Sequence, residues 1–401
     1  MDSMRRSLAL VATVACAAAQ PAIAVESCDV DGQSVNPANG NTTAGKTGLM
    51  RCRDGAGGPV VREQELQNGV FLGVVRYFRD GQLEKEHRVN ERGNRDGVAR
   101  EYAAADKGAK PVLVREETYR NGRTVGLVRS WYPSGQLRRV SFHGDDEREV
   151  AAAELTPEGR LYELQCGPRP VLAPDADDAH WCGHVGGASN VVLYSGKGVA
   201  KARLSYERGE RRRSEQLGES GVVRELQEAT TSGGTERSFY ADGTKRREVQ
   251  WIAGPGERPR RVTTLEQEFH ETGKLVHEKR WRASENGSEL ALEQRWYLNG
   301  QPKERVEYVA ADGRTLRQET AYFDNGKKSF EGAWRVASAQ TRGRDVATGV
   351  HRSFDENGRL RSERFHDERG RVTRERELDG NGAVVRDDEV FEDGSRKAYT
   401  R

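Results

Sequence analysis

A short turn motif recurs through most of the chain and restricts the folds that this sequence can adopt. Each copy has an aromatic residue, two to four polar residues, a glycine and a further polar residue, as in Tyr77–Leu83 and Trp131–Leu137. Asp-Gly and Asn-Gly pairs supply the positive φ angles of tight hairpin turns. The motif therefore predicts successive β-hairpins, with turn glycines at Gly81, Gly135, Gly243, Gly273, Gly300, Gly313, Gly326, Gly358, Gly370, Gly382 and Gly394.

The segments between the turns alternate as β-strands do, and they are polar on much of both faces. In residues 372–378, one face would carry Val372, Arg374, Arg376 and Leu378. A lone hairpin of this kind is marginal in water, so neighbouring repeats must stack to cover their aromatic side chains. We therefore interpret the aromatic positions as packing between repeats, at Tyr77, Tyr132, Tyr240, Phe269, Tyr297, Tyr322, Phe354, Phe365 and Phe391.

Composition narrows the fold class further. Of the 401 residues, 35% are hydrophobic and 32% are charged, which is too little apolar material for the core of a large barrel or doubly wound sheet. The 28 aromatic residues exceed the 12 prolines, which disfavours a fully disordered chain. We predict an all-β, elongated array of hairpins that form a thin, open, meandering sheet, with a disulfide-stapled loop inserted into it.

Charge argues against nucleic acid as a partner. The 65 basic and 63 acidic residues nearly cancel, giving a net charge of +2. Nucleic-acid binding usually needs a basic patch, because contacts to phosphates dominate the affinity. The short basic runs at 211–213 and 258–261 are diluted by acidic neighbours such as Glu210. We expect paired charges on a solvated face.

The amino terminus has the features of an export signal. Arg5 and Arg6 precede an apolar run, Leu8–Ala19, and a small-x-small site ends at Ala24. We expect residues 1–24 to be cleaved and the mature chain to be periplasmic or secreted in bacteria, with no transmembrane segment. A second possibility is a lipoprotein acylated at Cys16, which follows a lipobox-like Thr-Val-Ala.

Cysteine positions define two interruptions of the repeat. Cleavage after residue 24 leaves an even set that suits disulfides in an oxidising compartment. Spacing suggests Cys28–Cys52 and Cys166–Cys182, although three pairings are formally possible. The predicted organisation is a cap at 25–60, a first repeat block at 61–163, a cysteine-bracketed loop at 164–190 and a second repeat block at 191–401.

The repeats resemble the bacterial MORN-repeat variants, which are often grouped as antitoxin-like repeat proteins. The resemblance rests on Gly69-x-x-x-Gly73-Val74-x-x-Tyr77-x-x-x-Gly81-Gln82-Leu83 and on the similar run from Tyr119 to Leu137. It implies successive hairpins in an elongated sheet and an antitoxin or immunity role, although an export signal fits poorly with a cytosolic antitoxin. A weaker resemblance, to YD-repeat proteins, rests on Phe354–Leu360.

Two motifs suggest chemistry, but the residues around them favour a turn-rich loop and a disulfide instead. Residues 40–47 match the phosphate-binding loop letter by letter, yet the flanking residues predict neither the buried strand nor the helix that this loop needs. His180, Cys182 and His184 offer metal ligands, but a cysteine pair in an exported chain is more often a disulfide. We therefore expect no cofactor and no metal.

Two classes of function follow from these features. The first is a non-enzymatic repeat scaffold that presents a long, mixed-charge sheet face to a protein or to another component of the cell envelope. The second is an enzyme or metal-binding protein with a site in the 164–190 loop, where His180 and His184 lie near Asp177 and Asp178 in sequence. The sequence favours the scaffold, because it has many repeats and no convincing catalytic motif.

Overall fold

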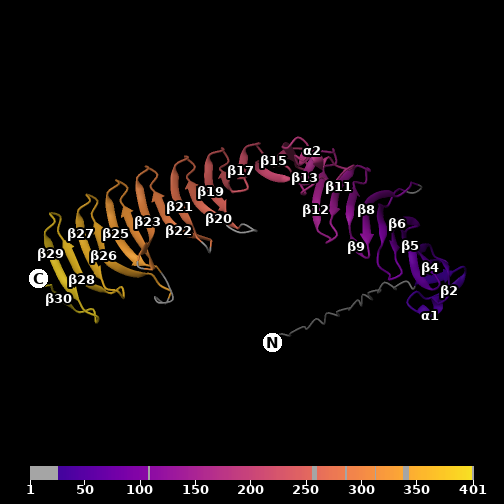
Figure 1. Cartoon of the computed structure of the whole chain (residues 1–401), viewed down its shortest axis with the longest axis horizontal. Helices are drawn as coiled ribbons and strands as arrows, with labels where there is room; N and C mark the ends of the chain where they lie inside the picture. Colours follow the sequence, from indigo (N-terminus) through magenta and orange to yellow (C-terminus); the bar gives the residue numbers. More distant parts are fainter. Residues whose placement is uncertain are drawn as a thin grey trace, which may run out of the picture. The chain divides into compact units, whose positions relative to one another are not determined.

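The computed structural model of the chain describes residues 26–106, 109–254, 260–284, 287–311, 313–336 and 343–399. Strands are the main secondary structure of these residues, and their two helices, α1 (Gly40–Thr43) and α2 (Asp178–Trp181), are single turns. The strands form two open antiparallel sheets (Figure 1). The prediction of an all-β array of hairpins is confirmed, whereas the predicted signal segment, with Cys16, lies outside the described residues.

Two compact units make up the described part of the chain. The first comprises its residues from 26 to 137 together with 143–148, and the second comprises 138–142 together with the described residues from 149 to 399. The first unit holds α1 and the strands β1 (Glu26–Val30), β2 (Gln33–Val35), β3 (Gly48–Asp54), β4 (Val60–Gln67), β5 (Val70–Arg79), β6 (Gln82–Val89), β7 (Gly97–Ala103), β8 (Val112–Arg120), β9 (Arg123–Thr124) and β10 (Gly126–Trp131). Its strands pair mostly with their neighbours in sequence, although β2 lies at the edge beside β1 and β9 pairs with β8 alone.

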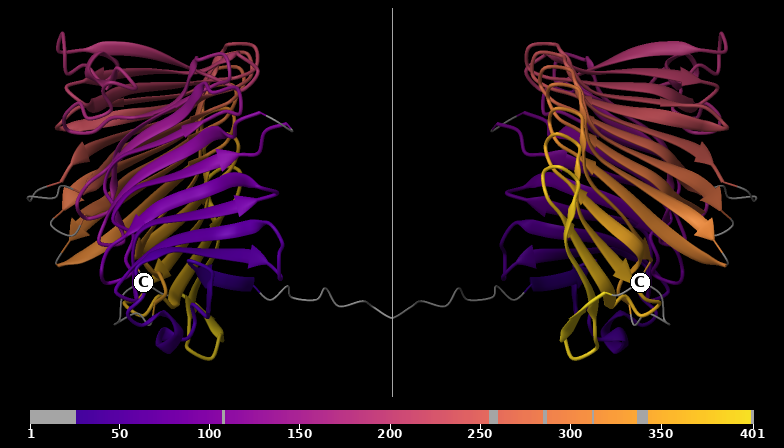
Figure 2. Two further views of the ribbon diagram at one scale, coloured as in Figure 1. Left: turned by 90° about the vertical axis from the view of Figure 1, so that its right-hand side faces the viewer. Right: turned by 90° about the vertical axis from the view of Figure 1, so that its left-hand side faces the viewer.

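The second unit is a longer succession of hairpins. It begins with the middle of β11 (Leu137–His143), whose two end residues belong to the first unit, and with β12 (Glu149–Leu155) and β13 (Leu161–Gln165). These three strands belong to the 13-stranded sheet of the described residues. The next strands are β14 (Ser189–Tyr194), β15 (Ala200–Glu207), β16 (Glu210–Leu217), β17 (Val223–Ala229), β18 (Gly233–Phe239), β19 (Lys245–Ala253), β20 (Arg261–Phe269), β21 (Leu275–Ser284) and β22 (Gly287–Trp296). The last are β23 (Pro302–Ala311), β24 (Arg314–Tyr322), β25 (Lys328–Arg335), β26 (Val346–Phe354), β27 (Leu360–His366), β28 (Val372–Leu378), β29 (Val384–Val390) and β30 (Arg396–Ala398). Strands β14–β30 pair in strict chain order and run side by side (Figure 2).

Most of the turns share one geometry because the sequence motif repeats, whereas the turns at Gly81 and Gly313 are two-residue hairpin turns. In the turn between β22 and β23, the amide of Gly300 donates to the carbonyl of Tyr297, and the amide of Tyr297 donates to the carbonyl of Gln301, each at 2.9 Å. All eleven predicted turn glycines have φ between 72° and 89°. Adjacent turns are also joined by side chains. The side-chain amide of Asn299 donates to the Asp324 carbonyl at 2.6 Å, and that of Asn325 donates to the Glu356 carbonyl at 2.7 Å.

Buried apolar side chains lie at the start of the first sheet and, in larger number, between Val125 and Tyr206 on either side of the 164–190 loop. One cluster comprises Cys28, Val30, Val35, Met50, Cys52 and Leu66, with Val61 and Phe71 packed against it. The Cys28–Cys52 disulfide joins β1 to β3 within this cluster. Strands β1–β3, which lie within the segment 25–60 that the sequence sets apart as a cap, therefore belong to the same sheet as the first repeats.

The loop at 164–190 links β13 to β14 within the second unit. Cys166 and Cys182 form the second disulfide, and Leu172 inside the loop is fully buried. Across the link, the Tyr206 hydroxyl donates to the Leu164 carbonyl at 3.3 Å, and the Arg160 guanidinium donates to the Gly198 carbonyl at 2.8 Å. The loop is thus a stapled connection, as its cysteines predict. No helix among the described residues is long and apolar enough to span a membrane.

Candidate interaction surface

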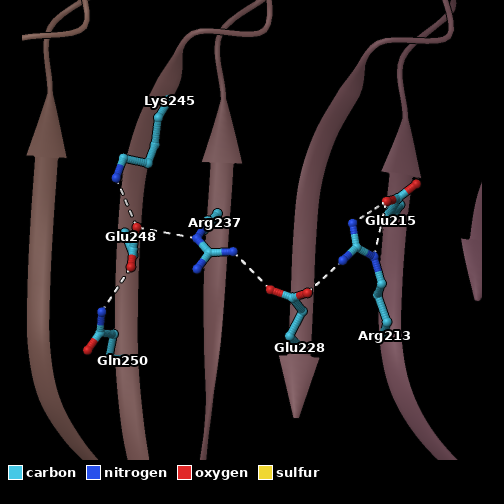
Figure 3. A network of polar contacts seen from close by, with 7 residues as sticks. All are labelled: Arg213, Glu215, Glu228, Arg237, Lys245, Glu248 and Gln250. Carbon is cyan, nitrogen blue, oxygen red and sulfur yellow. Dashed lines mark hydrogen bonds and ion pairs between the residues drawn. The ribbon is translucent and has the colours of Figure 1, made fainter. Parts of the chain in front are cut away.

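Paired charges cover one face of the second sheet. Figure 3 shows Arg213 on β16 bonded to Glu228 on β17, which also accepts from Arg237 on β18, with N–O distances of 2.6 and 2.9 Å. Arg237 continues to Glu248 on β19 at 3.3 Å. Burial alone would raise the pKa of Glu248, but hydrogen bonds from Gln250 and Lys245 bring it below its usual range. Alternating charges therefore link four successive strands.

The same arrangement recurs in both units. Near the carboxyl end, Glu363 on β27 accepts from Arg352 on β26 and from Arg376 on β28, each at 2.9 Å, and Arg376 also contacts Asp387 on β29 at 3.3 Å. In the first unit, N–O distances of 2.9–3.7 Å connect Arg51, Glu63, Arg76, Glu86, Arg100, Glu116 and Arg129, from β3 to β10. We call these series the ion-pair networks. Within each network, the arginine and carboxylate side chains join neighbouring strands and neutralise one another's charge.

The opposite face of β25–β30 is different, because it carries a groove of about 310 Å³. We call it the C-terminal groove. Its polar lining comes from His351, Ser353, Ser362, Arg364, His366 and Glu375. Phe330, Val372 and Val390 supply apolar walls, and Arg396 on β30 completes the lining. Six consecutive strands thus contribute side chains to one hollow.

A column of planar side chains, whose rings are tilted against one another, leads into this groove. The guanidinium of Arg317 on β24 lies 4.2 Å from the Trp334 ring on β25. Trp334 lies 4.5 Å from His351 on β26, and His351 lies 4.2 Å from His366 on β27, as centroid distances. Gly332 makes room for the column, since a Cβ there would lie 2.9 Å from the His351 ring. A glycine inside a strand often marks such a close approach.

The charges in the groove are unevenly matched. Glu375 accepts from Nε of Arg364 at 2.9 Å and from Nη1 of Arg396, so one carboxylate faces two guanidinium groups. The hydrogen bond from Arg364 is the main reason that the pKa of Glu375 lies below its usual value. The pKa of His366 is also lowered, mainly by burial and then by the neighbouring His351. Nδ1 of His366 is buried without a hydrogen-bond partner among the described residues.

The predicted repeat aromatics lie between hairpins or beneath cations. The hydroxyls of Tyr240 and Tyr297 donate to the carbonyls of Phe269 and Tyr322, at 2.8 and 2.9 Å, one hairpin further along the sheet. In the first unit, Tyr77 stacks on His87 at 6.0 Å. Phe354 lies under Lys328 and Phe365 under Arg374, while Tyr132 begins a turn and Phe391 is 44% exposed.

The candidate residues of the 164–190 loop are not brought together as one site. His180 pairs with Asp177 at 2.8 Å on the surface, and the pKa of Asp177 is lowered chiefly by this hydrogen bond. Asp178 is buried and accepts from the backbone amides of Val171 and Leu172. Cys182 is bonded to Cys166. Among the described residues, the one group with metal-ligand geometry is Glu26, Cys28 and Cys52, and its cysteines form a disulfide.

The segment that matches a phosphate-binding loop has a different backbone. Its helical turn, α1, begins at Gly40, before the lysine, and strand β3 begins directly after Thr47. A phosphate-binding loop needs a strand before it and a helix after the lysine. Lys46 instead bonds to the Gln33 side chain.

Comparison with known proteins adds little beyond the fold class. No protein-family model and no curated protein matches the chain. Among solved structures, it is similar to the crystal structure of TcdB2-TccC3-Cdc42, with 10% identity and a TM-score of 0.18, and to the Photorhabdus luminescens Tc holotoxin pore, with 9% identity and a TM-score of 0.16. Each match covers 88% of this chain and 20% of the other. Scores this low support no argument about function, so the resemblances to MORN-repeat variants and YD-repeat proteins rest on the short motifs alone.

Proposed function

We propose that the chain is a non-enzymatic repeat scaffold that binds a partner, a protein or a component of the cell envelope, on the face that bears the C-terminal groove. The observation that carries this proposal is the contrast between the two faces of β25–β30. On one face, arginine and glutamate satisfy each other in the ion-pair network. On the other, aromatic rings and two arginines surround an open hollow.

This contrast matters because binding energy is concentrated in few residue types. Tryptophan, tyrosine and arginine are the usual anchors of protein interfaces, and exposed ion pairs contribute little. Trp334 on β25, Arg364 on β27 and Arg396 on β30 all lie on the groove face of the sheet. Stacked hairpins suit such a role, since repeat proteins present extended surfaces built from contacts between neighbouring units.

We further propose that the scaffold acts outside the cytoplasm, in the periplasm or beyond the cell. Two disulfides are consistent with an oxidising compartment. Mass spectrometry of the exported protein tests the proposal, with a mature chain beginning at Val25 as the expected result. A diacylglyceryl group on Cys16 would instead indicate a lipoprotein.

The binding proposal is tested by affinity capture from envelope extract. The bait is the full exported chain, either wild type or with Trp334→Ala and Arg364→Gln combined. The matched control is Arg361→Gln on the same strand, since Arg361 is exposed, does not line the groove and contacts Asp355 at 3.5 Å. We expect one partner to be captured by the wild type and by the control but lost with the double variant. Equal capture by all three proteins, or no specific capture by the wild type, would contradict the proposal.

A further inference from the structure

We propose that the C-terminal groove binds a carboxylate group and that this binding strengthens when His366 gains a proton. The inference deepens the proposed function, on which it rests for the biological role of the site, by giving the chemistry that the partner must present. Its physical basis is the set of groups that face the hollow.

The first step concerns free hydrogen-bond donors. Arg364 donates a hydrogen bond from Nε to Glu375, and no described residue accepts a hydrogen bond from its two terminal amino groups. Arg396 donates a hydrogen bond from Nη1 to the same carboxylate. Glu375 therefore balances one of two positive charges and leaves one guanidinium fork available. Planar guanidinium groups bind carboxylates through two parallel hydrogen bonds, which favours a carboxylate over a neutral group.

The second step concerns size and the remaining walls. A volume of about 310 Å³ lies at the lower end of the range for ligand pockets, roughly 300–1,000 Å³. Ser353 and Ser362 add hydroxyl groups that can donate or accept, while Phe330, Val372 and Val390 supply apolar contact. The hollow therefore suits a carboxylate carried on a group about as large as one amino acid or one sugar ring.

The third step concerns pH. His366 is faced by His351 from β26, Arg364 on its own strand, Asp367 at the end of that strand, Glu375 from β28 and Arg396 from β30. Arg317 lies at the far end of the column of planar side chains, on the other side of Trp334 from His351. Burial, His351 and Arg364 lower the pKa of His366, and Asp367 is already paired with Arg371.

A bound carboxylate favours the protonated imidazole, so by linkage protonation favours the bound carboxylate. Affinity then rises as pH falls from 7.5 toward the lowered pKa of His366 and is lost once the ligand itself is protonated, near pH 4. With His366 protonated, the added charge is expected to tighten carboxylate binding by roughly fivefold, the effect of one opposite charge in near-bulk-water screening.

The experiment uses the full exported chain with its disulfides intact and two probes, N-acetylglutamate and glucuronate. These represent the side chain of an acidic peptide and an acidic sugar. N-acetylglutamine and glucose are the neutral controls. Calorimetry at pH 5.5 and 7.5 is expected to show saturable binding of at least one carboxylate, up to roughly fivefold tighter at pH 5.5, and none of its neutral control. The probe that binds identifies the source of the carboxylate.

Three variants separate binding from folding. Arg364→Gln is expected to abolish binding, Arg361→Gln to leave it unchanged, and His366→Asn to keep binding at pH 7.5 while losing the gain at pH 5.5. Circular dichroism shows whether each variant is folded, and if Arg364→Gln is not folded, Ser362→Ala, expected to weaken binding, takes its place. Absence of saturable binding by wild type, or equal binding by folded Arg364→Gln, overturns the inference.

The two proposals fail in different ways. A partner that is captured by wild type and lost with Trp334→Ala alone, while no carboxylate binds, leaves the scaffold standing and removes the carboxylate site. Carboxylate binding without any captured partner leaves the carboxylate site standing and removes the scaffold proposal.

Discussion

Replacing Glu363 with glutamine should loosen the hairpins around β27 by an amount that the structure allows us to estimate. The Glu363 side chain is 8% exposed and accepts charged hydrogen bonds from Arg352 and Arg376, each at 2.9 Å. Such a bond contributes about 1.5–3 kcal/mol when well shielded. Because the two arginines are 39% and 22% exposed and contact other acids, we take about 1 kcal/mol for each bond. The expected loss is about 2 kcal/mol.

This loss is best measured locally, because long repeat arrays do not unfold as one two-state unit. Amide hydrogen exchange followed by mass spectrometry reports on each hairpin separately. A loss of about 2 kcal/mol corresponds to exchange roughly 30-fold faster in β26–β28. The matched control is Glu356→Gln in the exposed turn between β26 and β27. Equal exchange in the two variants would refute the view that the ion-pair networks hold the strands together.

Three further results are expected. Hydrogen bonds from arginine or lysine are the main reason that the pKa values of Glu215, Glu331 and Glu375 lie below their usual range, so the stabilisation from these pairs is complete above about pH 4.3 and is lost as pH falls through the lower folded values. Circular dichroism between pH 6 and 2 should show β-structure lost only below about pH 4, and a signal that stays constant to pH 2 would contradict this. Gly332→Ala should push the His351 ring out of its column and destabilise the β25–β26 hairpin by about 1–3 kcal/mol, whereas Gly380→Ala, which has open space around it, should not; equal melting of the two variants would show that the column is not tightly packed. Reduction of the disulfides should speed hydrogen exchange in 164–190 and around β1–β3 while leaving β18–β30 protected, because repeat contacts are between nearest neighbours; a collapse of the whole array on reduction would be the contrary result.

The hairpins could be predicted because each depends on residues close in sequence. An Asn-Gly pair such as Asn299-Gly300 fixes its own turn and therefore the pairing of the strands on either side. Alternation correctly separates Arg376, in the ion-pair network, from Glu375, in the groove. The alternating pattern is wrong for Val372, which it places on the face opposite Glu375. Val372 lines the groove together with Glu375, because the pairing of β27 with β28 shifts register between Phe365 and His366. A bulge of this kind leaves no signal in a pattern of alternating letters.

The C-terminal groove could not be predicted, because it depends on the register of six strands together. Phe330 and Arg396 are 66 positions apart, and no short motif connects them. One signal is present in part. His351 and Arg364 are nearly equidistant from the turn at Asp355–Arg359, so hairpin geometry alone places them opposite each other, as the structure has them. The column from Trp334 to His366 needs in addition the space left by Gly332, which no repeat pattern predicts.

The central claim, that the groove face holds the partner, is tested most directly by site-specific photo-crosslinking in cells that export the chain. A photoreactive amino acid is placed at Val390, which lines the groove, or at its exposed neighbour Glu389, which points to the opposite face of the same strand. We predict a single crosslinked product from position 390 and none from position 389. Crosslinking from 389 alone, equal crosslinking from both positions, or none from 390 would contradict the account.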